Sequence, residues 1–249
     1  MRLASYIRFA AFFFIVGIAN QGHTAEDFSA CPQFFANATP PVVATRSSNH
    51  ALCFDAFALL HSGESKTPVY VAEKLTRASV SDAHEPRTNE FYEEARLPSS
   101  ERATLEDYRG SGFDRGHMAP AGDMPTAVAM VQSFSLANTI PQAPEHNRGV
   151  WAKSVEMATR KYVARASGDV FVITGPVYVP DIANSPSIGT GHVRVPKYLF
   201  KLVYDHTTNR AWVHWHENSN STRGSRPISY GELVRRTGIE FLPNIKPYE

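Results

Sequence analysis

The sequence predicts a mixed α+β fold in which a mostly antiparallel sheet is packed with a few helices. Short apolar and aromatic stretches bounded by turn residues predict strands, and one long stretch with apolar residues at helical spacing predicts a helix. No internal repeat or long low-complexity tract interrupts the 249 residues, of which 43% are hydrophobic and 20% charged. One domain with a sizeable core is therefore expected.

The elements follow from these patterns. A helix is predicted over Gly149–Ala166, because apolar side chains recur there every three or four residues. Residues 77–112 and 217–226 are polar and are expected to form irregular surface segments, while the polar residues 205–209 form a hairpin turn. The predicted strands are, in chain order, Phe54–His61, Pro68–Ala72, Ser133–Ile140 (ended by Pro141), Val170–Thr174, Tyr198–Tyr204 and Ala211–Trp215.

The first 25 residues have the pattern of a secretory signal. Arg2 and Arg8 lie in and beside a short polar start, and the apolar run Phe9–Ala19 has about half the ~20 residues that a membrane span needs. Cleavage after Ala19 and after Ala25 both fit, and an uncleaved anchor is the alternative. Residues 1–25 are thus expected to be a signal peptide and residues 26–249 one exported domain, secreted or periplasmic, with no membrane span in the mature chain.

Two cysteines, Cys31 and Cys53, lie near the start of the expected mature chain. Export would place them in an oxidising compartment, which favours a disulfide over two free thiols. In the chain-entropy model a loop of this length contributes on the order of 3 kcal/mol. No C-x-x-C spacing indicates redox chemistry, so a structural bridge is expected.

The net charge excludes a broad basic surface. The whole chain carries +1, and removing residues 1–25 takes away two arginines and no acidic residue, which leaves 23 basic against 24 acidic residues. A protein that coats nucleic acid is usually far more positive. A polyanion site in this chain must therefore be a local cleft with a few arginines of its own.

Three separated segments carry chemistry. A lone histidine is usually a packed core side chain, but His117 lies in a run of polar residues and two further polar motifs follow it. Together they resemble the DNA/RNA non-specific endonuclease family, which includes endonuclease G and whose active site is the ββα-metal motif. The resemblance extends weakly from about Leu52 to Phe241. The motifs are Asp114-Arg115-Gly116-His117, Asn138-Thr139-Ile140-Pro141-Gln142 and Asn147-Arg148-Gly149-Val150-Trp151.

The resemblance implies that His117 is the general base. A histidine with an ordinary pKa near ~6.5 is largely unprotonated at neutral pH and can take a proton from water. It also implies that Asn147 is the protein ligand of one Mg²⁺, with Mn²⁺ as a substitute, on the leaving-group side. Mg²⁺ needs few protein ligands because it keeps several waters. Taken alone, Asn147 would be a helix N-cap.

Further site residues follow from the same resemblance. The family's acidic helix residue falls at Val155, but the acid here is Glu156, so a small offset at the helix start is expected. Arg160 keeps a four-residue spacing from Glu156, and an ordinary surface pair of the two is the alternative. The implied roles are catalytic for Arg115 and Glu156, and substrate-binding for Arg87, Arg160 and Asn138, with Asn138 also ordering waters or backbone and Asp114 shaping the first strand.

The function that the sequence predicts is an exported endonuclease that hydrolyses DNA and RNA with little sequence specificity. A phosphodiesterase acting on another substrate and an inactive nucleic-acid-binding relative are the alternatives. The resemblance is also compatible with a homodimer. A metal site at His214 and His216, which share one strand face, is less favoured than packed or solvated histidines, because no third ligand lies nearby.

Overall fold

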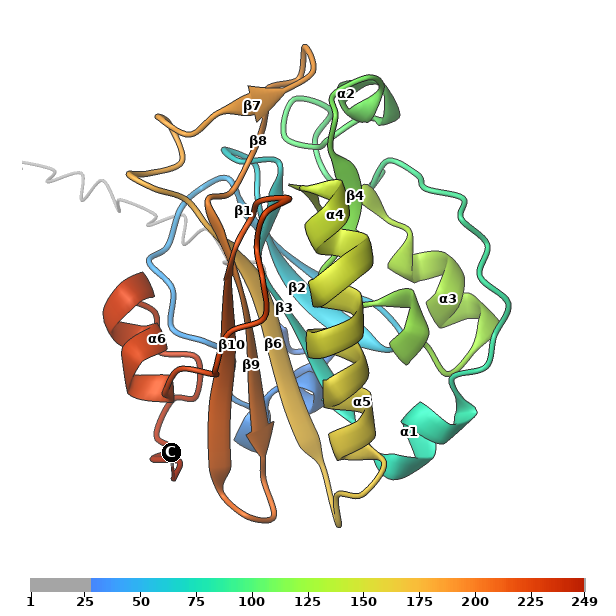
Figure 1. Cartoon of the computed structure of the whole chain (residues 1–249). Coiled ribbons are helices and arrows are strands. Elements are labelled where there is room, and N and C mark those ends of the chain that lie inside the picture. The colour runs from blue at the N-terminus through green and yellow to red at the C-terminus, as the bar shows by residue number, and fades with distance from the viewer. Residues whose placement is uncertain (1–27, 249) are drawn as a thin grey trace, which may run out of the picture.

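A computed structural model describes residues 28–248, which form an antiparallel sheet with helices on both faces (Figure 1). Each pair of neighbouring strands in this six-stranded sheet is antiparallel, which confirms the predicted fold class. The strands are, in spatial order, β1 (Asn49–Cys53), β2 (Phe57–Ser62), β3 (Thr67–Leu75), β6 (Val170–Val177), β9 (Tyr198–Asp205) and β10 (Arg210–Glu217).

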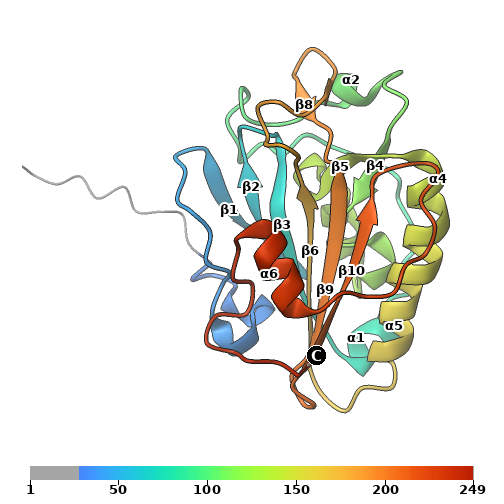
Figure 2. The same cartoon turned by 60° about the vertical axis from the view of Figure 1, so that its left-hand side comes forward.

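Alternation along the strands gives the sheet two apolar faces. On one face Tyr70, Ile173 and Leu202 join a core that is covered by the N-terminal turns and by α6 (Tyr230–Thr237). On the opposite face Val71 and its neighbours join cores covered by the other helices. Figure 2 shows α6 on one side of the sheet and α4 and α5 on the other.

The second face carries a small unit of two strands and a helix. β4 (Asp114–His117) pairs antiparallel with β5 (Thr139–Gln142). The chain then runs directly through α4 (Pro144–His146), a π-helical segment (Asn147–Glu156) that is kinked at Gly149, and α5 (Met157–Val163). The remaining elements are α1 (Arg77–Asp82), α2 (Leu105–Tyr108), α3 (Ala127–Ser133), β7 (Ser187–Ile188), β8 (Val193–Arg194) and short 3₁₀ turns at 32–34, 36–38, 121–123 and 136–138.

The π-helical segment is the largest difference from the predicted helix. The N–H of Met157 donates to the carbonyl of Ala152, an i→i−5 bond in place of the i→i−4 bond of an α-helix. Gly149 lies inside the segment with φ −100° and ψ −109°, outside the helical region. A π-helical turn takes more residues than an α-helical turn, so every side chain after it is displaced around the axis.

Two strand predictions need correction. The strand expected over Phe54–His61 begins at Phe57, and the separate strand β1 precedes it. Residues 133–138, expected to be extended, end α3 and form a 3₁₀ turn, and β5 begins only at Thr139.

Pro141 lies within β5 because β4 and β5 form an isolated pair, in which a missing donor on an outer edge is tolerated. The segment 77–112, expected to be irregular, contains α1 and α2.

The predicted disulfide is confirmed. Cys31 and Cys53 are bonded with a Cα–Cα distance of 5.8 Å, and the bond ties the N-terminal turns to the end of β1. The expected signal peptide, residues 1–25, lies outside the described residues. Within residues 28–248, none of the helices has the length and apolar character that crossing a bilayer requires.

Candidate active site

The β4–β5 pair places the first two motifs side by side. Arg115 lies opposite Pro141, and His117 lies opposite Thr139. Gly116 lies between Arg115 and His117 and passes close to the Gln142 side chain. A Cβ atom at residue 116 would come within 2.0 Å of Gln142 Oε1. Only glycine allows this approach, which brings the two strands close enough to hold Arg115 and His117 in fixed positions.

His117 is buried, with 7% of its surface exposed. Its ring packs against Phe91 at 5.2 Å and Phe134 at 4.9 Å between centroids, and Nε2 has no hydrogen-bond partner among the described residues. Burial, and to a smaller extent the positive charges of Arg87 and Arg115, lower the pKa of His117 to about 3. The imidazole is therefore neutral at physiological pH, as a proton acceptor must be.

Both arginines near His117 line one cavity. The guanidinium carbon of Arg115 lies 4.5 Å from the Phe91 ring centroid, and that of Arg87 lies 5.0 Å from the Phe134 centroid. The cavity measures about 260 Å³ and opens to solvent. Its lining residues are Arg87, Phe91, Tyr108, Phe113, Asp114, Arg115, Asn147 and Arg148.

Asn147 begins the π-helical segment and faces this cavity. Its side-chain Nδ2 donates to Asp114 Oδ2 at 2.9 Å, which orients the amide. Arg148 pairs with the same carboxylate, with Nε 2.8 Å from Oδ2. In this arrangement Asp114 shapes the site from β4, and the amide oxygen of Asn147 is the atom that would take a cation.

The oxygen donors of the cavity suit a hard cation such as Mg²⁺ or Mn²⁺ better than a thiolate- or imidazole-binding metal such as Zn²⁺. In the described part of the chain, no three histidine, cysteine or acidic side chains lie close enough together to hold a metal ion. One amide oxygen beside one carboxylate, with room for waters, suits a hard cation that keeps most of its hydration shell. The cavity and the oriented Asn147 amide therefore fit the cofactor that the resemblance implies.

The π-helical segment determines where Glu156 lies. Val155 is 1% exposed and packs with Trp151 in the core, whereas Glu156 is only half-buried. The pKa of Glu156 is raised to about 7, mainly by burial; the positive charges of Lys201, Arg160 and Arg87 oppose the rise, and the negative charge of Asp123 adds to it. The positive charge of Arg87 therefore lowers the pKa of Glu156 as well as that of His117.

Arg160 lies beside the same group of charges. Its Nη1 donates to Asp123 Oδ1 at 2.7 Å, and Asp123 is 3% exposed. The surface pair with Glu156, considered as an alternative from the sequence, is thus replaced by a part-buried pair with Asp123. Arg160 does not line the cavity of about 260 Å³ that contains Arg87 and Arg115.

Asn138 was expected to bind substrate, but its side chain binds backbone groups instead. Its side chain is fully buried, accepts from the backbone N–H of Ala119, and donates to the carbonyls of Ala119 and Ser133 at 2.9 Å. All of these partners are backbone groups. Asn138 therefore orders the chain that leaves His117, and a direct contact between its amide and substrate would require these hydrogen bonds to break.

Several buried polar residues near the site were not predicted. Glu73 on β3 is fully buried with neither carboxylate oxygen hydrogen-bonded, and burial and Asp123 raise its pKa well above the ordinary value. Lys201 donates to Thr174 Oγ1 at 2.7 Å. His216, which was expected from the sequence to be packed or solvated rather than a metal ligand, is buried; its Nδ1 lies 3.2 Å from His146 Nε2 and so links β10 to the residue before Asn147. Single polar residues in apolar strand patterns are the only sequence signal for these groups.

Two antiparallel strands followed by a helix, with the histidine on the first strand and the asparagine at the helix start, form the layout of a ββα nuclease site. The sequence model of the DNA/RNA non-specific endonuclease family matches residues 36–247. The chain belongs to this family.

Individual proteins that are similar to this chain are nucleases by name. "Nuclease EXOG, mitochondrial" of Homo sapiens is 32% identical over 217 residues, which cover 80% of this chain and 58% of that protein. "Endonuclease G, mitochondrial" of Homo sapiens is 33% identical over 208 residues, which cover 77% of this chain and 69% of that protein. A chain of the solved EndoG/EndoGI complex superposes with a TM-score of 0.72 at 26% identity, covering 82% of this chain and 95% of that one.

The chain spans about half the length of the EXOG relatives that it matches, with 43%, 58% and 50% coverage of the Xenopus laevis, human and mouse proteins. Together with Nuclease 1 of Schizosaccharomyces pombe, these are mitochondrial nucleases by name. The predicted secreted or periplasmic location is therefore wrong, and the relatives point to the mitochondrion. Basic and apolar residues without acids occur in both secretory and mitochondrial targeting segments, so residues 1–25 did not separate the two.

Proposed function

We propose that this chain is a metal-dependent endonuclease that hydrolyses phosphodiester bonds in DNA and RNA with little sequence specificity, leaving 5′-phosphate and 3′-hydroxyl ends. The observation that supports this most directly is a buried neutral imidazole, that of His117, within electrostatic reach of two arginines that line one cavity. Phosphodiester hydrolysis needs a proton acceptor next to positive charge, and both are present here.

His117 acts as the general base that takes a proton from the attacking water. Its free ring is neutral because burial and two arginines disfavour the imidazolium. A bound phosphate brings negative charge beside the ring and so raises the pKa of His117 toward the working pH, where general-base catalysis is most efficient. The same arginines that keep the free ring neutral would then be occupied by phosphate.

Arg87 and Arg115 bind and neutralise the phosphate. Planar guanidinium groups present paired N–H donors that match phosphate oxygens. Each guanidinium already lies over a phenylalanine ring, so little side-chain freedom is lost when substrate binds. Arg160, held by Asp123, contributes positive charge near Glu156.

Asn147 would hold Mg²⁺ or Mn²⁺ through its amide oxygen, with Asp114 fixing the orientation of the amide. When bound, the cation supplies Lewis-acid stabilisation of the charge that develops on the 3′ oxygen. Glu156 would accept hydrogen bonds from waters on that cation, a role that suits a half-buried carboxylate in a group of mixed charges.

The test is cleavage of supercoiled plasmid and of a long RNA by the purified chain, with Mg²⁺, with Mn²⁺ and with EDTA. We expect both substrates to be cut with either metal, neither to be cut with EDTA, and the product ends to accept ligation without phosphatase treatment. His117→Ala should lose ~10²–10⁴ in rate while binding substrate. A His117→Ala protein with unchanged turnover would rule out the mechanism.

A further inference from the structure

Phe91 and Phe134 enclose the His117 ring. The Phe134 ring meets it edge-on, with centroids 4.9 Å apart and planes at 87°, and the Phe91 ring lies 5.2 Å away at 50°. The two phenylalanines also contact each other at 4.9 Å and 74°. Tilted and edge-on contacts at these distances are favourable for aromatic pairs, so the imidazole cannot turn without displacing a ring.

Each phenylalanine also has an arginine over it. Arg115 lies over Phe91, and Arg87 lies over Phe134. A guanidinium is attracted to the negative face of a ring, so each arginine has a preferred position even without substrate. The two rings therefore contact the histidine and both arginines at once.

We infer that Phe91 and Phe134 form an aromatic clamp that positions the general base and both phosphate-binding arginines as one unit. This inference rests on the proposed function, in which His117 is the general base and Arg87 and Arg115 bind the phosphate. Phe91 and Phe134 are positioning residues for these three side chains. Neither ring touches the reacting atoms in this scheme; both act through the side chains that they hold.

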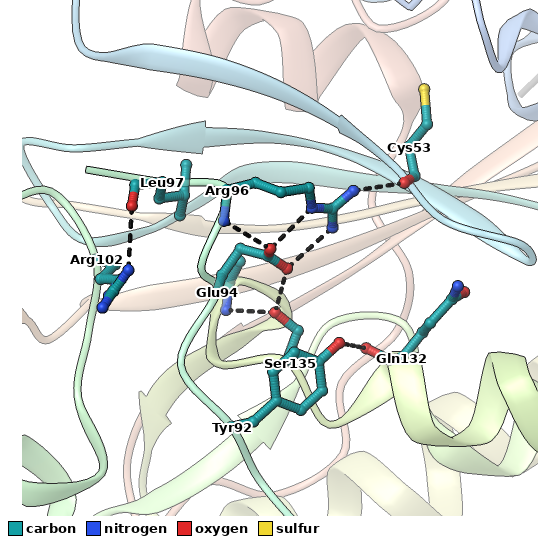
Figure 3. A network of polar contacts seen from close by, with 9 residues as sticks. Cys53, Tyr92, Glu94, Arg96, Leu97, Arg102, Gln132 and Ser135 are labelled. Carbon is teal, nitrogen blue, oxygen red and sulfur yellow. Dashed lines mark hydrogen bonds and ion pairs between the residues drawn. The ribbon is translucent and has the colours of Figure 1, made fainter. Parts of the chain in front are cut away.

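The segments that carry the clamp are joined to each other. Tyr92 N–H donates to the carbonyl of Phe134 at 3.2 Å, and Leu136 N–H donates to the carbonyl of Tyr92 at 2.8 Å. The Glu94 carboxylate, 5% exposed, accepts from Ser135 Oγ at 3.0 Å (Figure 3). The clamp is thus assembled from two stretches of chain that cannot slide past each other.

Arg96 completes the support. Its Nε and Nη2 donate to the two Glu94 oxygens at 2.8 and 2.9 Å, and Nη1 donates to the Cys53 carbonyl at 2.9 Å (Figure 3). Burial raises the pKa of Glu94, but the hydrogen bonds and charge of Arg96 outweigh it and hold the pKa below its ordinary value. Glu94 is therefore ionised at neutral pH and keeps all of these bonds.

Opening the clamp should change the titration of His117, whereas loss of a purely structural core residue should not. The charges that act on His117 from the elements around it are those of Arg87 and Arg115, while the two rings exclude water. Replacing a ring by a smaller side chain admits water and loosens an arginine, and both changes favour the imidazolium. Opening the clamp should therefore move the protonation of His117 to higher pH.

The chain offers a matched control outside the site. Phe54 is 7% exposed, stacks on Phe57 at 4.4 Å, and has Arg96 over its ring at 4.3 Å. It belongs to the same core as Phe134. Phe54→Leu removes a buried ring under a guanidinium, as the clamp variants do, but it leaves in place both rings and both arginines around His117. Arg96 still has the Glu94 carboxylate and the Cys53 carbonyl as partners in this variant.

The experiment combines two readouts on Phe91→Leu, Phe134→Leu and Phe54→Leu. One is the pH titration of the His117 ring proton by NMR in the metal-free protein, assigned by its loss in His117→Ala. The other is kcat and KM for a DNA substrate at saturating Mg²⁺. We expect the clamp variants to titrate at least one pH unit higher than wild type and to lose about 10- to 100-fold in kcat. Phe54→Leu should match the wild-type titration and stay within about twofold in kcat.

Phe91 is partly exposed, so Phe91→Tyr keeps the ring with room for a hydroxyl, and it should restore both readouts. If Phe134→Leu does not fold, Phe91→Leu and Phe91→Tyr decide alone. Wild-type titration and kcat in a folded Phe91→Leu would overturn the clamp. Undiminished cleavage by His117→Ala would instead reject His117 as the general base, and a wild-type protein that cuts neither DNA nor RNA would reject the proposed function. In both cases the NMR titration would still show whether the rings control the imidazole.

Discussion

Asn147 donates a hydrogen bond from its side-chain nitrogen to the Asp114 carboxylate, and this contact joins the first and third sequence motifs across 33 residues of chain. The amide has one donor and one acceptor end, so binding Asp114 through nitrogen turns the oxygen away from Asp114. The acidic residue of the first motif thus acts on the cation site through the asparagine.

Removing this contact should weaken metal dependence without abolishing it. In Asp114→Ala the Asn147 amide loses its orienting partner, and Arg148 loses its ion pair. Loss of a group that orients a metal ligand typically costs ~10- to 100-fold in affinity. We expect the Mg²⁺ concentration for half-maximal cleavage to rise by that factor, measured by titrating Mg²⁺ at fixed substrate.

An equivalent pair elsewhere provides the control. Asp181 accepts from the Asn184 side chain at 2.9 Å and lies away from the cavity. Asp181→Ala should leave the Mg²⁺ titration unchanged. If Asp114→Ala behaved in the same way, Asp114 would have no part in orienting the cation site.

Acid should destabilise the fold. Burial lowers the pKa of His61, His146 and His214 to about 4 and that of His117 to about 3. In the unfolded chain histidines take up protons near pH 6.5. The unfolded state then binds more protons than the folded state, so the free energy of unfolding falls as the pH decreases from about 6.5 toward 4.

Two carboxyl groups act in the opposite direction. Burial raises the pKa of Glu73 and Glu156, the latter to about 7, so between pH 4.5 and 7 the folded state keeps protons that the unfolded state releases. Burial also lowers the pKa of His216, so five histidines outnumber two carboxyls, and a net loss of stability on acidification remains. Urea unfolding at pH 7, 6, 5 and 4.5 measures it; a midpoint that stays constant or rises toward pH 4.5 would contradict the histidine assignment.

The disulfide should stabilise the fold without taking part in catalysis. It closes a loop with a sequence separation of 22, which corresponds to about 3 kcal/mol in the chain-entropy model. Neither cysteine lines the active-site cavity. We expect the Cys31→Ser/Cys53→Ser double variant to unfold at lower urea and to keep wild-type kcat well below its melting temperature. Lost activity with an intact circular dichroism spectrum would show that the bridge acts on the site.

Periodicity predicted the inner strands of the sheet well, because their apolar runs face packed layers on both sides. It missed β1, whose residues Asn49 and His50 are polar and only partly buried. It also ended a strand at Pro141, although β5 continues through it. In both places tertiary pairing, which local sequence does not encode, determines the backbone.

Three short motifs were enough to single out His117, Arg115 and Asn147 as candidates, because each motif is contiguous in sequence, and the structure places Arg115 and Asn147 at one cavity and His117 on the same strand as Arg115. Phe91 and Phe134 carry no such signal, since buried phenylalanines occur throughout the chain. Their position beside His117 depends on a bridge between Tyr92 and Ser135 that brings distant segments together. Glu73 and Asp123 were missed for the same reason.

The last prediction concerns the helix register. The π-helical segment from Asn147 to Glu156 absorbs the additional residue that separates Trp151 from the acid, so Val155 faces the core and Glu156 faces the charges. Val155→Glu would bury an unpaired carboxylate beside Trp151, which costs several kcal/mol or forces protonation. We expect it to lower the melting temperature strongly. Ser154→Glu, exposed on the same segment, should leave stability nearly unchanged.

Glu156→Gln should instead leave the fold intact and raise the Mg²⁺ concentration for half-maximal cleavage by about tenfold, the lower end of losses at groups that hold metal-bound waters. Asn147→Ala should have a larger effect than Glu156→Gln, because it removes the direct ligand. Melting curves and Mg²⁺ titrations of the four variants show whether Glu156 or residue 155 faces the metal-bound waters. A stable Val155→Glu protein with improved metal affinity, together with an unaffected Glu156→Gln protein, would mean that residue 155 and not Glu156 faces the metal-bound waters.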